Sequence, residues 1–334
     1  MFFFSKKTTI ASSGILQGAT DHHSHILPGV DDGVETMDEA LRILATYEAA
    51  GIKTLWLTPH IMEDIPNTPQ KLEARFLELK AAYTGNITLH LAAEYMIDNH
   101  LLKLLQETNK LRPAFEGVVL PEAFQETPPR FRGEVVEDRR GEKSPKEYPF
   151  GTTEGTKTKN CPSFKRGTSN TGNIAQKVQD NNNSPSSKRE YPQGEGVEKK
   201  SIAEGVELLP IGSKGNHLLV ETSYYNPPMR FRETLRQIKS LGYHPLLAHP
   251  ERYMYMDNDE YRELHNEGVR FQLNLPSLCG AYGNTVKKRA QWLLKNGLYD
   301  AIGSDTHCEE GAEFLLASLI KERELKTIGP LFRI

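Results

Sequence analysis

The chain has 334 residues, which is long enough for one large domain or two ordinary ones. Its 41 basic and 44 acidic residues give a formal net charge of −3, so there is no electrostatic case for nucleic acid as a partner. No stretch approaches the roughly 18 apolar residues of a membrane span, and the short apolar start, with its lysines after it, lacks the order of a secretory signal. We therefore expect a cytoplasmic protein without a membrane span.

A stretch rich in histidine and aspartate occupies residues 21–33. His23 and His25 are alternate residues, so an extended strand presents both imidazoles to one side. A Pro-Gly turn then folds the pair Asp31 and Asp32 back toward them. Imidazole and carboxylate are ligands of borderline or hard divalent metals. The alternative, a polar surface loop, is disfavoured because later strand ends carry matching residues.

Helices and strands alternate along the rest of the chain. Thr36 and Glu39 fit a capping box that begins a helix, and Gly51 ends it. The β-branched run 52–58 predicts a buried strand, and Thr68-Pro69 begins the next helix. Further strands are expected at 87–93, 217–220, 245–248, 269–275 and 299–303, and further helices near 101–105, 230–241, 260–265 and 286–294, with a last one after residue 307.

The composition changes between residues 115 and 205, which are crowded with Pro, Gly, Ser, Asn, Lys and Glu. In residues 151–200 only seven side chains are hydrophobic, too few to offset the entropy of ordering that length of chain. We expect a disordered, low-complexity insertion within one domain that spans residues 18–323.

Seven predicted strands that alternate with helices indicate a parallel α/β fold. Without the insertion about 240 residues remain, close to the size of one (β/α) barrel. A doubly wound open sheet is the alternative. The placement of the polar residues favours the barrel, because the C-terminal ends of all its strands meet on one rim.

Six of the seven predicted strands carry a histidine or an acid at or just beyond the C-terminal end. These residues are His23, His25, His60, Glu94, Glu221, His249, Asp305 and His307. With Asp32, four carboxylates would share a pocket and raise one another's pKa, and divalent cations would remove that repulsion. Because no cysteine is among the ligands, we expect an open, multinuclear catalytic site rather than structural zinc.

Six short strings on both sides of the insertion carry a family resemblance. They are HSHILPGVDDG at 23–33, TPH at 58–60, AE at 93–94, VE at 220–221, AHPERY at 248–253 and SDTH at 304–307. Together they resemble the PHP superfamily (polymerase and histidinol phosphatase) and, within it, the CpsB-type manganese-dependent protein-tyrosine phosphatases of bacterial capsule and exopolysaccharide clusters. The match covers about residues 18–112 and 212–323.

The resemblance implies a distorted (β/α)7 TIM-like barrel, the PHP fold, with three divalent metals, Mn²⁺ first and Fe or Zn as alternatives. By position, the three ligand sets are His23, His25, Glu94 and Asp305; Glu94, Glu221 and His249; and Asp32, His60 and His307. His249 and Arg252 are the catalytic candidates, since Arg252 matches an arginine that grips the substrate phosphate in this family.

The expected reaction is hydrolysis of protein phosphotyrosine by a metal-bound hydroxide, and the expected substrate is a bacterial tyrosine autokinase that controls polysaccharide export. A histidinol-phosphate or other small phosphomonoester phosphatase is the alternative enzyme, and a catalytically impaired PHP binding module is the alternative from another class. A cysteine-based phosphatase is excluded, because no cysteine is followed by an arginine at the Cys-x5-Arg spacing. His22 replaces an apolar residue of the family pattern, and we expect its side chain to point away from the metals.

Overall fold

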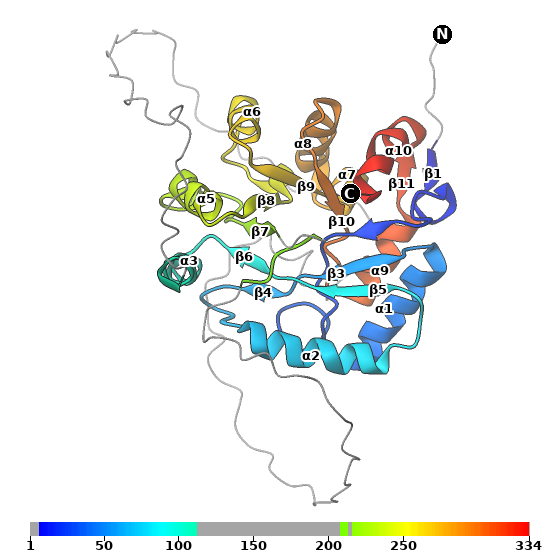
Figure 1. Cartoon of the computed structure of the whole chain (residues 1–334). Coiled ribbons are helices and arrows are strands. Elements are labelled where there is room, and N and C mark those ends of the chain that lie inside the picture. The colour runs from blue at the N-terminus through cyan, green and yellow to red at the C-terminus, as the bar shows by residue number, and fades with distance from the viewer. Residues whose placement is uncertain (1–6, 112–207, 213–215, 334) are drawn as a thin grey trace, which may run out of the picture.

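The computed structural model describes residues 7–111, 208–212 and 216–333. The predicted insertion, at 115–205, lies wholly outside the described residues. In the described part, parallel strands form a curled sheet and the helices lie around its outer side (Figure 1). The mixed α/β architecture predicted from the sequence is therefore confirmed.

The elements follow the predicted alternation. The strands are β1 (Lys7–Thr9), β2 (Thr20–Asp21), β3 (Thr54–Leu57), β4 (His60–Ile61), β5 (Thr88–Leu91), β6 (Glu94–Met96), β7 (His217–Glu221), β8 (His244–Ala248), β9 (Arg270–Asn274), β10 (Ala301–Gly303) and β11 (Leu319–Lys321). The α-helices are α1 (Met37–Ala50), α2 (Pro69–Ala82), α3 (Asn99–Leu111), α5 (Phe231–Ser240), α6 (Asn258–Asn266), α7 (Leu275–Cys279), α8 (Gly283–Lys295), α9 (Glu309–Ala317) and α10 (Glu322–Ile328).

The curled sheet consists of two parallel parts. One has six strands in the order β10-β9-β8-β7-β6-β4, and the other has three in the order β2-β3-β5. Backbone bonds join the parts where β5 passes into β6: the N–H of Ala92 donates to the carbonyl of Leu57, and that of Glu94 to Pro59. At the far edge, the N–H of His22 donates to Ile302, which brings β10 beside β2. The result is a half-barrel rather than the flat open sheet that we considered as the alternative.

Local sequence signals explain where the helices begin. The hydroxyl of Thr36 accepts the N–H of Glu39 at the start of α1, and the hydroxyl of Thr68 accepts the N–H of Lys71 at the start of α2. Only one half of the predicted capping box of α1 is present, because the Glu39 carboxylate accepts the N–H of Glu309 instead. The antiparallel pair β1–β11 and the short helix α7 were not predicted.

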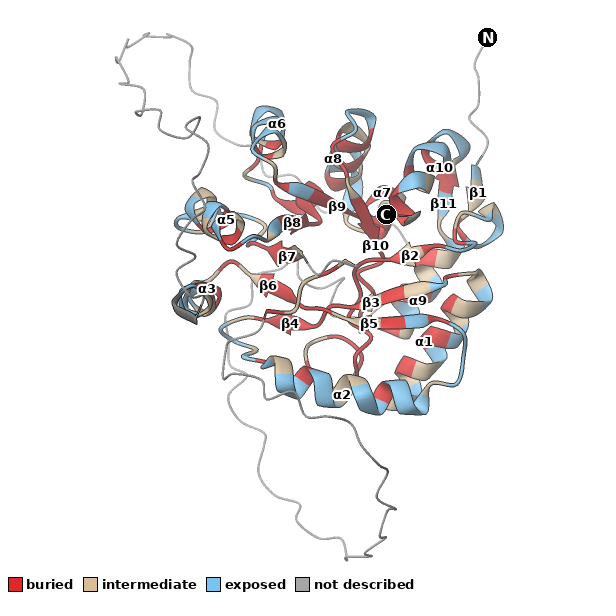
Figure 2. Cartoon of the chain, viewed as in Figure 1, coloured by how far each residue is buried: buried red, intermediate tan, exposed pale blue. Residues whose placement is uncertain are grey.

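Alternate residues of the central strands belong to different hydrophobic clusters. Leu218 and Leu247 pack into the main core between sheet and helices, whereas Leu219, Leu246 and Ala248 form a smaller second cluster. Because successive side chains of a strand point to opposite faces, the second cluster lies on the inner face of the curled sheet. Figure 2 shows the burial along the strands and along the sides of the helices that face them.

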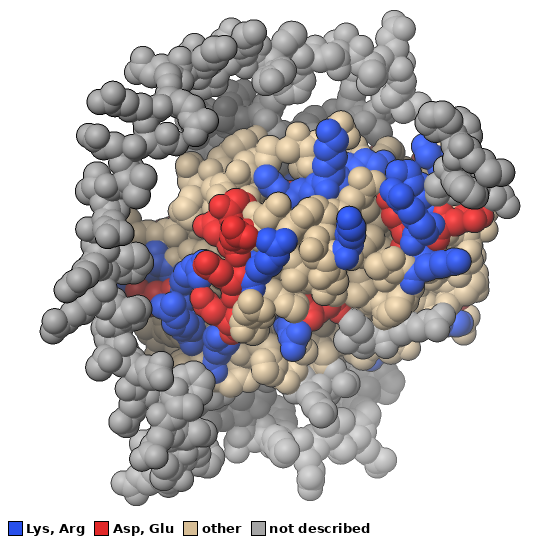
Figure 3. Space-filling view, turned by 90° about the horizontal axis from the view of Figure 1, so that it is seen from above, with Lys and Arg blue, Asp and Glu red and all other residues tan. Residues whose placement is uncertain are grey.

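Charged side chains are scattered over one face of the molecule. On the face seen in Figure 3, basic and acidic side chains lie among uncharged residues and do not form one basic field. None of the described helices is both long enough and apolar enough to cross a bilayer.

Candidate metal centre

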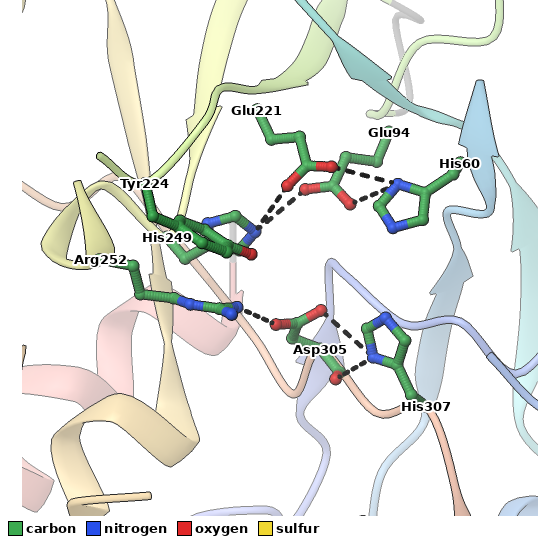
Figure 4. Close-up of a pocket in the computed structure, with 8 residues that line it drawn as sticks. All are labelled: His60, Glu94, Glu221, Tyr224, His249, Arg252, Asp305 and His307. Carbon is green, nitrogen blue, oxygen red and sulfur yellow. Dashed lines mark hydrogen bonds and ion pairs between the residues drawn. The ribbon is translucent and has the colours of Figure 1, made fainter. Parts of the chain in front are cut away.

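The predicted ligands gather at the end of the sheet where the parallel strands finish. His23 and His25 follow β2, His249 follows β8, and Glu221 is the last residue of β7. Parallel strands end at a common edge, and α/β barrels carry their active sites there. Figure 4 shows six predicted ligands around one pocket: His60, Glu94, Glu221, His249, Asp305 and His307.

Two of these ligands, His60 and Glu94, stand where the chain resumes as a strand after a short interruption. The strands β3 and β5 stop at Leu57 and Leu91, and the chain resumes as β4 and β6, whose first residues are His60 and Glu94. His60 and Glu94 are paired directly in the parallel register. Their side chains therefore lie at the same level of the sheet, where the Nδ1 atom of His60 is 3.2 Å from a Glu94 oxygen.

Two predicted ligands sit on strained backbone. His249 has a φ of 34° and Asp305 a φ of 52°, both in the left-handed region that residues with a Cβ rarely adopt. Such a conformation costs on the order of 1 kcal/mol per residue and persists where the surrounding structure holds it in place. At both positions the strain turns the side chain into the pocket drawn in Figure 4.

The ligand atoms form four overlapping groups, within each of which they lie no more than 4.8 Å apart. The groups are His25, Asp32, His60 and His307; His23, His25 and Asp305; His23, Glu94 and His249; and His60, Glu94 and Glu221. All nine predicted ligands belong to at least one group, and four of them belong to two. Shared ligands of this kind are what a multinuclear centre requires.

These groups do not reproduce the predicted ligand sets one by one. The Nε2 atom of His60 is 3.4 Å from Asp32, with which we expected it to share a metal, but its Nδ1 atom is 3.4 Å from Glu221, which was assigned to another. His60 thus stands between two of the predicted sets, and the division of ligands among the ions stays a prediction.

Hydrogen bonds orient the two imidazoles that begin the motif. The Nδ1 atom of His23 lies 2.9 Å from the carboxamide oxygen of Gln272, and the Nδ1 atom of His25 lies 2.7 Å from the Asp31 carboxylate. Both oxygens are acceptors, so Nδ1 carries the proton in each neutral ring and Nε2 presents a lone pair. The two Nε2 atoms are only 3.0 Å apart.

Two lone pairs that face each other at this distance repel, and a divalent cation that both nitrogens bind removes the repulsion. The nine side chains offer only imidazole nitrogen and carboxylate oxygen, a donor set that suits Mn²⁺, Fe²⁺ or Zn²⁺. Eight of the nine are buried, and only Asp32 is partly exposed. The residues present therefore fit a centre of divalent metal ions.

The charges in the pocket overturn one expectation. We expected the carboxylates to raise one another's pKa, but the pKa of Glu94 lies well below its usual value. Burial alone would raise it, and the surrounding imidazoles, His23 first, outweigh burial. The pKa of Asp305 is lowered in the same way, with His23 and His307 as the main partners. The expectation is wrong for Glu94 and Asp305, because five histidines lie among the acids.

When no metal is bound, protonated histidines supply the positive charge that faces the carboxylates. Burial lowers the pKa of His23, but the charges of Glu94 and Asp305 outweigh it and raise the value to about 9. Burial also lowers the pKa of His25, but neighbouring carboxylates, Asp31 first, outweigh it and raise the value to about 10. Metal ions and protons therefore compete for these two rings.

Arg252 lies at the edge of the pocket, in a short 3-10 helix after β8. Its guanidinium carbon is 4.3 Å from the ring centre of Tyr224 and 4.2 Å from that of Tyr282. Its Nη1 donates to Asp305 over 3.0 Å, and the amide of Asn274 donates to the same oxygen over 2.8 Å. This network orients both the arginine and a predicted metal ligand.

Sequence reasoning missed several of these residues. Asp31 and Gln272 hold the imidazoles, and Tyr224, Tyr282 and Asn274 surround Arg252 and its partner. Asp31 was visible within the motif but carried no assigned role, although a carboxylate beside a metal-ligating histidine is a common arrangement. Nothing in the sequence near Tyr282 points to a site.

The family model for capsular polysaccharide synthesis proteins, CpsB/CapC, matches residues 19–129 and 197–318. The chain belongs to the CpsB/CapC family. It is 31% identical over 134 residues to CapC of Staphylococcus aureus, named as a candidate tyrosine-protein phosphatase, and 32% identical over 120 residues to the tyrosine-protein phosphatase CpsB of Streptococcus pneumoniae. These alignments cover 40% and 34% of this chain and 50% and 46% of the relatives, so the chain spans about half the length of the curated relatives it matches.

A solved structure supports the fold of this CpsB/CapC family member. It comes from crystallographic work on YwqE of Bacillus subtilis and CpsB of Streptococcus pneumoniae, described there as metal-dependent tyrosine phosphatases. The TM-score is 0.55 at 16% identity, over 94% of this chain and 87% of the other. The family predicted from the six strings is confirmed, and so is the similarity of fold.

Proposed function

We propose that this protein is a metal-dependent phosphatase that hydrolyses phosphotyrosine on proteins. The observation that carries the proposal is the placement of Arg252 at the edge of the pocket into which the metal ligands point (Figure 4). A phosphomonoester dianion needs cations on more than one side, and this pocket offers an arginine opposite a donor set for divalent ions. Membership of the CpsB/CapC family and the names of its relatives support the same reading.

The protein's own side chains bind and orient the substrate. The guanidinium of Arg252 is fixed against two aromatic rings, so its remaining N–H groups are held in place to donate to phosphate oxygens. Such donors stabilise the charge that develops on the phosphoryl group during displacement. When bound, divalent ions lower the pKa of water and withdraw charge from phosphoryl oxygens. His249, whose pKa burial lowers to about 4, stays neutral at pH 7, as a metal ligand must.

The finer structural predictions belong to the same proposal. We infer that the half-barrel is a distorted (β/α)7 barrel whose edges meet through β10 and β2, in agreement with the backbone bonds His22 to Ile302 and Asp305 to His23. We also infer three metal ions, with Mn²⁺ as the first choice, held by His23, His25, Asp32, His60, Glu94, Glu221, His249, Asp305 and His307. Four overlapping ligand groups support more than one ion.

We propose a bacterial tyrosine autokinase as the natural substrate, and a phosphotyrosine peptide as its substitute in the assay. Hydrolysis would be measured with and without Mn²⁺, after treatment with a thiol-alkylating reagent, beside histidinol phosphate as the small-molecule competitor. We expect Mn²⁺-stimulated release of phosphate from the peptide that survives alkylation. Preference for histidinol phosphate would replace the proposed substrate class, and a metal-loaded protein inactive on both would indicate a binding module.

A further inference from the structure

A second cavity lies at the opposite end of the sheet from the metal centre. Its volume is about 920 Å³, at the upper end of the range found for small-molecule sites. It is lined by Thr20, Thr54, His217 and Arg270, which are the first residues of β2, β3, β7 and β9. Because these strands are parallel, their first residues lie at the end away from the metal ligands, and the two cavities share no lining residue.

Part of the cavity wall is apolar and belongs to the inner face of the sheet. The second hydrophobic cluster, on that face, includes Ala92, Ala248 and Ala301. In a filled barrel, layers of bulky branched side chains occupy the interior. Of these alanines only Ala301 lines the cavity, where it forms an apolar side of the wall together with Ile211 and Leu246.

Aromatic rings provide a platform at one side of the hollow. The indole of Trp56 stacks on the imidazole of His90, with ring centres 4.6 Å apart and an angle of 20° between the planes. Both residues line the cavity. A planar ring system can stack on such an aromatic surface and bury apolar area against it.

Two more imidazoles line the same cavity. His22, the departure from the family pattern, is turned away from the metal ligands as expected, and its Nδ1 atom is held 3.1 Å from the carbonyl of Ile302. The imidazole of His217 lies beside that of His244, with ring centres 5.5 Å apart. Among the described residues, none of these histidines joins a set of three possible metal ligands. The cavity therefore offers hydrogen-bonding groups rather than a metal site.

The lining has little net charge at neutral pH. Burial lowers the pKa of both His90 and His217, so their rings are neutral. The charged pair of the lining, Arg270 and Asp300, neutralises itself through a 2.8 Å ion pair. A cavity of this kind disfavours ions, which lose hydration without gaining an opposite charge.

We propose that this cavity binds an uncharged, planar heteroaromatic molecule of up to nucleoside size, which packs against the Trp56–His90 pair and is hydrogen-bonded by the neighbouring histidines. The ligand occupies a site separate from the metal centre, so the proposal does not depend on the phosphatase activity. Adenosine is the probe that tests it, because adenosine combines a neutral heteroaromatic ring with several hydrogen-bonding groups.

The chain has two tryptophans, so Trp292→Phe leaves Trp56 as the single tryptophan of the full-length protein, which can be excited selectively over the tyrosines. Adenosine should change the emission of Trp56 saturably, with a dissociation constant of about 1 mM or tighter. His217→Leu in this background should weaken binding about tenfold or more, and the milder His217→Asn repeats the test if the first variant folds poorly. His100→Leu, on α3 outside both cavities, is the matched control, and His249→Ala should bind adenosine normally.

Three outcomes would overturn the proposal. The first is the absence of a saturable change in Trp56 emission up to the solubility of adenosine. The second is a change that is unaffected in both His217 variants, which would place binding elsewhere. The third is equal competition by ribose, since recognition of a sugar without an aromatic ring would make the ligand class wrong. Circular dichroism should be the same in all variants, and metal content should be the same in all except His249→Ala, which separates loss of the cavity from loss of the fold.

Discussion

The guanidinium of Arg252 lies 4.3 Å from the ring centre of Tyr224, and both residues line the pocket of the candidate metal centre. Tyr224 also meets the imidazole of His249 edge-on, with ring centres 5.9 Å apart. One tyrosine thus touches both catalytic candidates. Its ring face is polarised toward a cation, so it fixes the arginine without neutralising its charge.

Replacement of the Tyr224 ring should weaken substrate binding. A cation–π contact of a buried arginine is worth about 0.5–2 kcal/mol, so Tyr224→Leu should raise KM for a phosphotyrosine peptide by about tenfold, with a smaller change in kcat. Tyr224→Phe keeps the ring and should behave like the wild type. Steady-state kinetics and inhibition by inorganic phosphate measure both. Equal losses in the Phe and Leu variants would mean that the hydroxyl matters rather than the ring.

Loss of His249 should remove one metal ion. His249→Ala deletes a ligand from the group with His23 and Glu94, and turnover should fall by about a thousandfold or more, because a catalytic metal supplies several kcal/mol. The metal count per chain, by mass spectrometry of the purified protein, should fall by one. His265→Ala, on α6 and outside every ligand group, is the control. Near-normal turnover in His249→Ala is incompatible with the assigned site.

Asp31 should affect metal affinity although it is not a predicted ligand. It accepts a hydrogen bond from His25 Nδ1 over 2.7 Å and one from the backbone N–H of His60 over 2.9 Å. Partners of metal-ligating histidines typically contribute 10- to 100-fold in metal affinity. Asp31→Asn should therefore bind Mn²⁺ more weakly by about that factor in a calorimetric titration, and Asp38→Asn, on α1, should not. Unchanged affinity would reduce Asp31 to a structural role.

Metal affinity should rise with pH. The pKa values of His23 and His25 without metal are about 9 and about 10, so both rings are positively charged at pH 7. Each ring must lose its second proton, the one on Nε2, to bind a metal. Each released proton makes the apparent affinity about tenfold stronger per pH unit, until the pH passes those values. Calorimetric titration of Mn²⁺ in two buffers of different ionisation enthalpy counts the protons. A count of zero between pH 6 and 8 contradicts the assigned ligands.

The gathering of the nine candidate ligands could be predicted, because the sequence indicates where each strand lies and ends. A short apolar run such as that before Glu221 or His249 predicts a buried strand, and parallel strands must end at one edge. This common edge brings together residues that are more than 200 positions apart in the sequence, such as His23 and His249. The helix starts at Thr36 and Thr68 follow from equally local chemistry.

The residues that sequence reasoning missed depend on side-chain packing between distant segments. Tyr282 reaches Arg252 from the segment between α7 and α8, and Gln272 reaches His23 from the interior of β9. Neither residue type signals a site, and neither contact follows from strand order. The sign of the pKa shift at Glu94 was missed for a related reason, since it depends on the number of imidazoles that surround the carboxylate.

The most direct test of the metal-dependent phosphatase is a titration of the metal-stripped protein with Mn²⁺, followed by phosphate release from a phosphotyrosine peptide. Chelation should abolish activity, and activity should return in proportion to bound metal until about three ions per chain are present, a number that follows from the family pattern of the nine ligands. Full activity in the stripped protein, or none when every ion is bound, would contradict the account.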